Sequence, residues 1–153
     1  MLVMTAKVNK KKIAIIAAGV VAVIVALVLL LGSENTAPTS SAIVSGNEDR
    51  VQFLSSFGWE VAVSPVQTSQ VRIPAESSQV FERYNALQKY QGYDLSPYAG
   101  KTVMRYVYTV KNYPGATEPV YATLLISGNQ VIGGDITDTA PAGMMQGFQK
   151  VTA

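Results

Sequence analysis

The sequence contains no cysteine and no histidine. Disulfide bonds, thiolate nucleophiles and catalytic triads with an imidazole base are therefore excluded. Metal sites built from cysteine or histidine ligands are excluded as well. Most enzyme mechanisms lose their base or nucleophile with these two residue types, so we expect a non-enzymatic protein with no cofactor and no bound metal, whose domain is stabilised by core packing alone.

Basic charge is scarce outside the N-terminus. Four of the twelve basic residues lie at the start of the chain, at Lys7, Lys10, Lys11 and Lys12. From residue 47 onward, eight basic residues face nine acidic ones, so this part of the chain is close to neutral. A nucleic-acid-binding domain carries a clustered basic surface. We therefore expect no nucleic-acid partner.

Residues 13–31 form an apolar run without a single polar or charged side chain. As a helix this run is about 28 Å long, which matches the hydrocarbon core of a bilayer. The preceding lysines favour retention of residues 1–12 in the cytoplasm. The sequence thus predicts a single-pass protein of the cell membrane, with a short basic cytoplasmic tail and an extracytoplasmic C-terminal domain.

A cleaved signal peptide is the alternative interpretation of the N-terminus. Signal peptides share the basic start but have a shorter apolar region of about 7 to 15 residues, followed by a small-residue cleavage site. Ser40, Ser41 and Ala42 provide such a site. The length of the apolar run favours a retained anchor over cleavage.

Small residues recur at every fourth position of this run, which places them on one helix face: Ala14, Ala18, Ala22 and Ala26. This spacing allows two helix backbones to approach closely. It indicates a homodimer or a protein partner within the membrane. The alternative is that alanine is simply common in such segments.

Residues 32–46 are rich in serine, threonine, glycine and proline and show no hydrophobic periodicity, so we predict a flexible stalk. Residues 47–153 then alternate between helical and strand patterns. The patterns predict a helix with Asn47 as its N-cap and Gly58 at its end, and a second helix over residues 78–91. Strands are predicted at residues 59–63, 70–73, 101–111, 119–127 and 130–136, and a short helix is predicted at residues 144–148.

These elements predict an α+β fold. We expect two helices packed on one face of a mainly antiparallel sheet of four to five strands, preceded by the transmembrane helix. The turn at residues 112–115 and the tight turn at Gly128 and Asn129 join three of the strands into a meander.

Several phrases of the sequence occur in an order typical of one family. They are NEDRVQFLSSFGWEV, QGYDLSPYAGK, RYVYTV followed by KNYPG, and VIGGDI. Residues 47–147 resemble an uncharacterised bacterial domain family without an assigned function, found behind a single N-terminal membrane span and mostly in Firmicutes. The resemblance implies a protein of the bacterial cell envelope. It implies no catalytic or binding residues.

Motifs for chemistry are weak. Gly100, Lys101 and Thr102 resemble the end of a phosphate-binding loop, but a strand pattern follows where that loop needs a helix. Asp135 and Asp138 lack the partners that a glycosidase pair or a calcium site requires. We expect Asp135 to end its strand and Asp138 to cap the residues that follow.

The chain has eight tyrosines, and most fall between residues 90 and 121. Exposed tyrosines provide contact area and a hydroxyl group for a partner. The candidate ligand or partner surface is therefore made of Tyr93, Tyr98, Arg105, Tyr113 and Tyr121. The alternative is that the tyrosines complete the core, since aromatic residues fill sheets well.

The sequence therefore predicts a membrane-anchored extracytoplasmic interaction or sensing module without catalytic activity. Two alternatives stay open. One is a regulatory subunit of a membrane complex that acts through its transmembrane helix, and the other is an envelope hydrolase that works without histidine.

Overall fold

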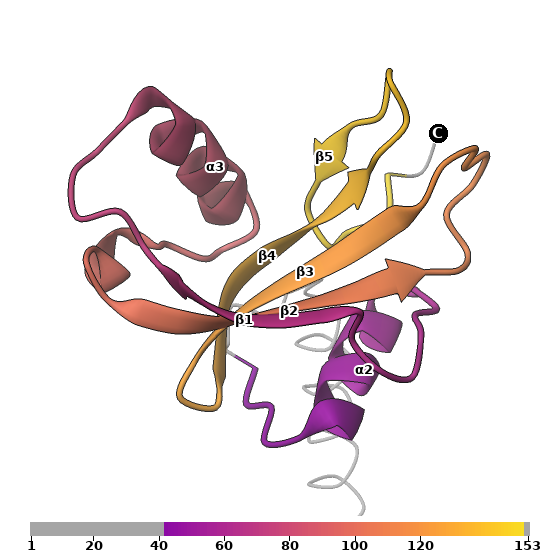
Figure 1. Ribbon diagram of the computed structural model, residues 1–153, viewed down its shortest axis with the longest axis horizontal. Coiled ribbons are helices and arrows are strands. Elements are labelled where there is room, and N and C mark those ends of the chain that lie inside the picture. The colour runs from indigo at the N-terminus through magenta and orange to yellow at the C-terminus, as the bar shows by residue number, and fades with distance from the viewer. Residues whose placement is uncertain (1–41, 152–153) are drawn as a thin grey trace, which may run out of the picture. The chain divides into compact units, whose positions relative to one another are not determined.

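The strands of the domain pair in the order in which they occur in the chain and form one antiparallel sheet (Figure 1). The computed structural model describes residues 42–151. Within this range the α+β fold and the three-stranded meander β2–β4 are confirmed. In chain order the elements are α2 (Asn47–Ser56), β1 (Gln67–Arg72), α3 (Gln79–Tyr90), the 3-10 turn η1 (Ser96–Tyr98), β2 (Thr102–Val110), β3 (Val120–Ser127), β4 (Gln130–Asp138) and β5 (Met145–Gln146).

The two helices pack on opposite faces of the sheet. Leu54 of α2 belongs to the same buried cluster as Tyr108 of β2, whereas Phe81 of α3 packs with Val103 on the other face. Figure 1 shows α2 below the sheet and α3 above it. The expectation that both helices cover one face is therefore wrong. The physical reason is that β2 carries apolar side chains on both faces, and each face needs a cover.

The N-cap of helix α2 lies one residue earlier than predicted. Gly46 is its N-cap, and the carboxylate of Asp49 accepts hydrogen bonds from the backbone N–H groups of Ser45 and Gly46 at 2.8 and 3.1 Å. Asn47 does not cap the helix. Its amide donates to the Val63 carbonyl and accepts from the Tyr108 hydroxyl. The side chain that we expected to cap α2 instead connects the helix to the sheet.

Two further predictions of local structure are wrong. Residues 59–63 form only an isolated bridge between Val61 and Val110, because Trp59 turns into the core and its indole N–H donates to the Phe148 carbonyl at 2.6 Å. Residues 144–148 contain strand β5 and no helix. Pairing of β5 with β4, together with burial of the Phe148 ring, outweighs the weak local helix preference.

Residues 42–46, which we expected in the stalk, belong to the domain. Val44 is 3% exposed and packs in the core below the sheet. The backbone N–H of Val131 donates to the Ala42 carbonyl, and that of Val44 donates to the Asn129 carbonyl. Residues 42–44 therefore lie along the start of β4.

The predicted cytoplasmic tail, transmembrane helix and remaining stalk lie outside the described residues, and so does the helix face formed by Ala14, Ala18, Ala22 and Ala26. Between residues 42 and 151 there is no helix with the length and apolar character needed to cross a membrane.

Side-chain amides of α3 and of its C-cap residue Gln91 contact the outer edge of β4. The Gln88 side-chain oxygen accepts from the Gly134 N–H at 2.8 Å, and the Gln91 amide donates to the Gly134 carbonyl at 3.0 Å. A bulge at Ile132 turns both Ile132 and Gly133 toward α3. Because glycine has no side chain, Gln88 can approach the strand closely at Gly133. These contacts hold α3 over one end of the sheet.

Candidate ligand-binding cleft

A cleft of about 940 Å³ lies between α3 and the sheet face that α3 only partly covers. This volume is within the range of small-molecule sites in proteins. The lining comes from β1, α3, β2, β3, β4 and β5. Its principal apolar members are Val71, Ile73, Phe81, Val107, Leu125 and Met145, and its principal polar members are Tyr84, Arg105, Tyr121, Thr123, Asp135 and Thr137.

Asp135 lies in the interior of β4 and is 4% exposed. The Tyr84 hydroxyl donates to one carboxylate oxygen at 2.8 Å, and the Thr137 hydroxyl donates to the other at 2.6 Å. The expectation that Asp135 ends its strand is wrong, because β4 continues to Asp138. Two hydroxyl donors compensate for its burial. Asp138 accepts from the Ala140 N–H in the following turn, as expected.

Burial raises the pKa of Asp135 above its ordinary value. The hydrogen bonds from Thr137 and Tyr84 and the charge of Arg105 lower this pKa in part. Burial also raises the pKa of Tyr84, and the nearby Asp135 charge raises it further. Tyr84 therefore stays a neutral donor at physiological pH. A carboxyl group with a perturbed pKa in a cleft is a common feature of functional sites.

Arg105 stands on β2, two strands away from Asp135 on the same face of the sheet. Its guanidinium donates to the Gln67 side-chain oxygen at 3.5 Å, which is a long and weak contact. In the described part of the chain the only salt bridge joins Lys89 to Asp94. Arg105 therefore has most of its five N–H donors without a protein partner.

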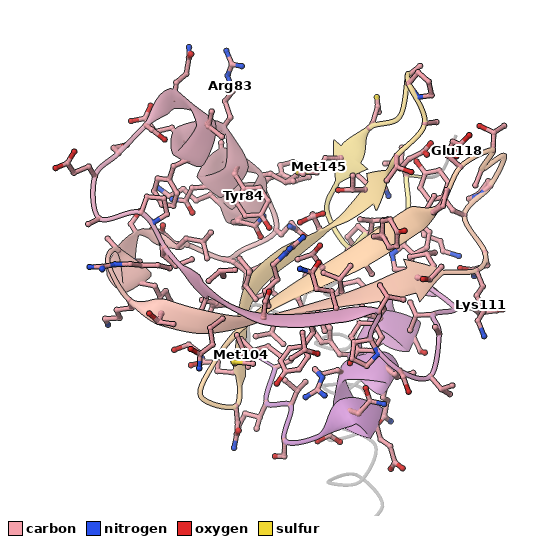
Figure 2. The ribbon with its side chains drawn as sticks, in the orientation of Figure 1. Arg83, Tyr84, Met104, Lys111, Glu118 and Met145 are labelled. Carbon is pink, nitrogen blue, oxygen red and sulfur yellow. The ribbon has the colours of Figure 1, made fainter. Side chains whose placement is uncertain are left out.

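The mouth of the cleft is apolar. Val66 before β1, Val80 on α3 and Met145 on β5 line it and are 58%, 79% and 50% exposed. In Figure 2, the Tyr84 side chain extends from α3 toward the sheet, and Met145 lies on β5, across from α3. Arg83, the neighbour of Tyr84, points away into solvent. Exposed apolar side chains around a hollow are typical of an interaction site.

The structure brings two of the five residues of the predicted surface into this cleft, Arg105 and Tyr121. Tyr93 instead packs edge-on against Phe148, and burial raises its pKa to about 12. Tyr98 is half-buried in the core beside α3, and Tyr113 stacks on Trp59. For these three tyrosines the alternative interpretation as packing residues describes their contacts.

Sequence reasoning missed Tyr84, Asp135 and Thr137 as members of a site. A signal was present, because residues two positions apart in a strand share a face, which assigns Asp135 and Thr137 to the same side. Between residues 42 and 151 no three histidine, cysteine or acidic side chains gather as a metal site would require. Asp135 is the single carboxylate of the cleft.

The fold and the cleft define a class: a small α+β domain with a five-stranded antiparallel sheet, one helix on each face and a hollow large enough for a small ligand. Residues 53–136 match the model of a family described as a domain of unknown function (DUF4830). The match covers more than half of the chain, so the chain belongs to this family. It extends from within α2 into β4 and includes both Arg105 and Asp135. Neither the curated proteins nor the solved structures yielded a match to this chain.

Proposed function

We propose that this protein is a non-catalytic binding module of a bacterial cell envelope, which senses or captures a small ligand in the cleft beneath α3. The observation that carries the proposal is the cleft itself. It is about 940 Å³ in volume, mostly apolar, and it contains two charged side chains from neighbouring parts of the sheet, Arg105 and Asp135. A concave apolar site with a few convergent polar groups is the usual form of a ligand pocket.

The lining supports binding rather than hydrolysis. Hydrolysis of glycosides by the common mechanism needs two carboxyl groups across a cleft, and this lining offers Asp135 alone. Both oxygens of Asp135 already accept hydrogen bonds from protein hydroxyl groups. Such a carboxylate is held in place and shielded, which suits a structural element of a binding site.

The cleft can be tested by narrowing its mouth. We expect the double variant Val66→Trp and Met145→Trp to obstruct ligand entry, because both side chains are exposed at the mouth. The full chain in nanodiscs is screened against soluble aromatic fragments by saturation-transfer NMR, with empty nanodiscs as the reference. Fragments that bind the wild type should lose at least about tenfold in affinity, the factor that corresponds to 1.4 kcal/mol.

The matched control is the double variant Val63→Trp and Met144→Trp. Both residues are exposed and neither lines the cleft, although Met144 directly precedes Met145 and Val63 lies three residues before Val66. This control should keep the affinity of the wild type. If no fragment distinguishes the two double variants, the cleft is not a binding site and the proposal is wrong.

We further propose that residues 13–31 anchor the domain at the outer face of the cell membrane. The apolar length and the lysines before it support this topology. The hydrogen bond from Val131 to the Ala42 carbonyl also disfavours cleavage after Ala42, which would separate that carbonyl from the domain. N-terminal sequencing of the protein from the membrane fraction should find the anchor intact. A sequence that starts at Ile43 would contradict this topology.

A further inference from the structure

The two charged side chains of the cleft differ in how much of their hydrogen-bonding capacity is used within the protein. Asp135 is buried, and each of its oxygens accepts a hydrogen bond from a hydroxyl group. Arg105 is only half-buried, and its one hydrogen bond, to Gln67, is 3.5 Å long. A guanidinium group has five N–H donors and no acceptor. The unfilled hydrogen-bonding capacity of the cleft therefore belongs to Arg105.

The geometry of a guanidinium group selects its partner. Its planar fork matches the two oxygens of a carboxylate, and such charge-assisted pairs are stronger than neutral hydrogen bonds. Hydroxyl groups of Tyr121 and Thr123 line the same cleft and can donate to an anion. A cationic ligand would instead have to displace the hydroxyl groups from a carboxylate that is almost fully buried.

The remainder of the cleft selects the body of the ligand. Phe81, Val107 and Leu125 form apolar walls inside, and Val66, Val80 and Met145 extend the apolar surface to the mouth. Burying apolar ligand surface against these side chains is favourable in proportion to the area removed from water. A fully polar anion would leave these walls without a partner.

We propose that the cleft binds an amphipathic organic carboxylate, with its carboxylate group on Arg105 and its apolar body against Phe81, Val107 and Leu125. This inference rests on the proposed function, because it names the chemical class of ligand for the same cleft. Asp135 lowers the affinity for such a ligand, since its negative charge competes with the ligand for the positive charge of Arg105.

The test uses three probes that share one apolar body and differ in their head group: 4-phenylbutyrate, 4-phenylbutan-1-ol and 4-phenylbutylamine. The full chain in nanodiscs of zwitterionic lipid is titrated with each probe by calorimetry, with empty nanodiscs as the reference. We expect the carboxylate to bind at least about tenfold more tightly than the alcohol, because a charge-assisted hydrogen bond adds to the same apolar contact. The amine should bind most weakly.

Two variants of Arg105 then locate the head group. Arg105→Gln should lower the affinity for 4-phenylbutyrate about tenfold and leave the affinity for the alcohol unchanged, while Arg105→Lys should fall in between because it keeps the charge and loses the fork. Arg72→Gln is the matched control, because it removes one positive charge from the neighbouring strand at an exposed position outside the cleft. Asp135→Asn should increase the affinity for the carboxylate.

The outcomes separate this inference from the proposed function. Equal affinities of the three probes, tightest binding of the amine, or no effect of Arg105→Gln would overturn the carboxylate assignment while cleft binding stands. No binding of any probe would also overturn it. In that case the comparison of the two tryptophan double variants decides whether the cleft is a binding site at all.

Discussion

The two faces of the sheet are covered to very different extents. On the α2 face, thirteen buried residues form one cluster that includes the largest buried side chains, Trp59, Tyr108 and Phe148. On the α3 face, the buried cluster contains five residues, and the surface beyond α3 opens into the cleft. One face therefore stabilises the domain, and the other keeps part of its surface accessible.

The polar groups follow the same division. On the α2 face, Arg50 stacks over the Tyr106 ring at 3.9 Å and donates to the Tyr108 hydroxyl at 2.9 Å, so its charge is used within the fold. On the α3 face, Arg105 has one weak contact within the fold. Arginine is therefore structural where it contacts aromatic partners within the fold, and it is available for a ligand where it does not.

The largest effect on stability is expected from substitution of two adjacent glycines, Gly133 and Gly134, which face opposite sides of β4. A side chain at Gly134 would meet the Thr123 carbonyl oxygen and the Phe148 ring, neither of which has room to move. A side chain at Gly133 would meet the end of the Gln88 side chain, which can shift only by lengthening its hydrogen bond to the Gly134 N–H. We expect Gly134→Ala to lower the free energy of unfolding by about 3 kcal/mol or more, and Gly133→Ala by about half as much.

Urea unfolding of the full chain in detergent, followed through the fluorescence of Trp59, measures both changes, since Trp59 is the only tryptophan. Gly128→Ala is a suitable control, because its positive φ of 60° strains an alanine while no atom lies near the new side chain. Equal losses for Gly133→Ala and Gly134→Ala would show that the two sides of β4 are equally rigid.

The next largest effect on stability is expected from substitution of two adjacent leucines on β3. Leu124 is fully buried on the α2 face, and Leu125 lines the cleft on the α3 face. Leu124→Ala should lower the free energy of unfolding by about 4 kcal/mol, because it leaves a cavity in a closed core. Leu125→Ala should cost about 2 kcal/mol, because water can enter the enlarged cleft. The same urea experiment measures both. A larger loss at Leu125 would reverse the assignment of the two faces.

The smallest expected effect is a pH dependence. The pKa of Asp135 is higher in the folded chain than its ordinary value of 3.8, so the folded state binds the proton more tightly than the unfolded state. The wild type should therefore lose stability as the pH rises from 3.8 through the raised pKa, and Asp135→Asn should not show this loss. We expect the two proteins to differ by about 1 kcal/mol or less, the scale of one hydrogen bond.

Urea midpoints between pH 4 and pH 7 for the wild type and Asp135→Asn measure this difference. Asp138→Asn removes a carboxylate from the same strand outside the cleft and corrects for the loss of one negative charge. If the wild type instead gains stability relative to Asp135→Asn as the pH rises, Asp135 is stabilised as an anion and the cleft is more polar than its lining indicates.

Local patterns in the sequence predicted most of the elements. Helix α3 forms where Ser78 provides a cap, with its hydroxyl accepting from the Phe81 N–H. Strands β2, β3 and β4 form close to the predicted bounds because residues 101–111 alternate and strong turn signals separate the three strands. Elements whose stability comes from distant contacts were missed. Strand β5 is two residues long and exists because β4 pairs with it.

The cleft was harder to predict than the strands. Period-two alternation states which residues share a face, but it does not state which face each helix covers, because β2 is apolar on both sides. The predicted surface grouped residues by type, and only Arg105 and Tyr121 proved to share the cleft. The sequence predicts Asp135 at a strand end because aspartate favours turns, and it is rarely buried within a strand unless it has partners. Its partner Tyr84 lies 51 positions earlier on α3.

The outer side of β4 has a consequence for solubility. Residues 42–44, the amides of Gln88 and Gln91, and strand β5 each occupy part of this side. Within residues 42–151 the sheet has two edge strands, β5, which is two residues long, and β1, whose sequence QTSQVR is mostly polar. Exposed apolar edge strands promote aggregation between chains. The domain thus keeps its most aggregation-prone strands, β3 and β4, in the interior of the sheet and presents a hydrophilic strand to other molecules in the crowded surroundings of a cell.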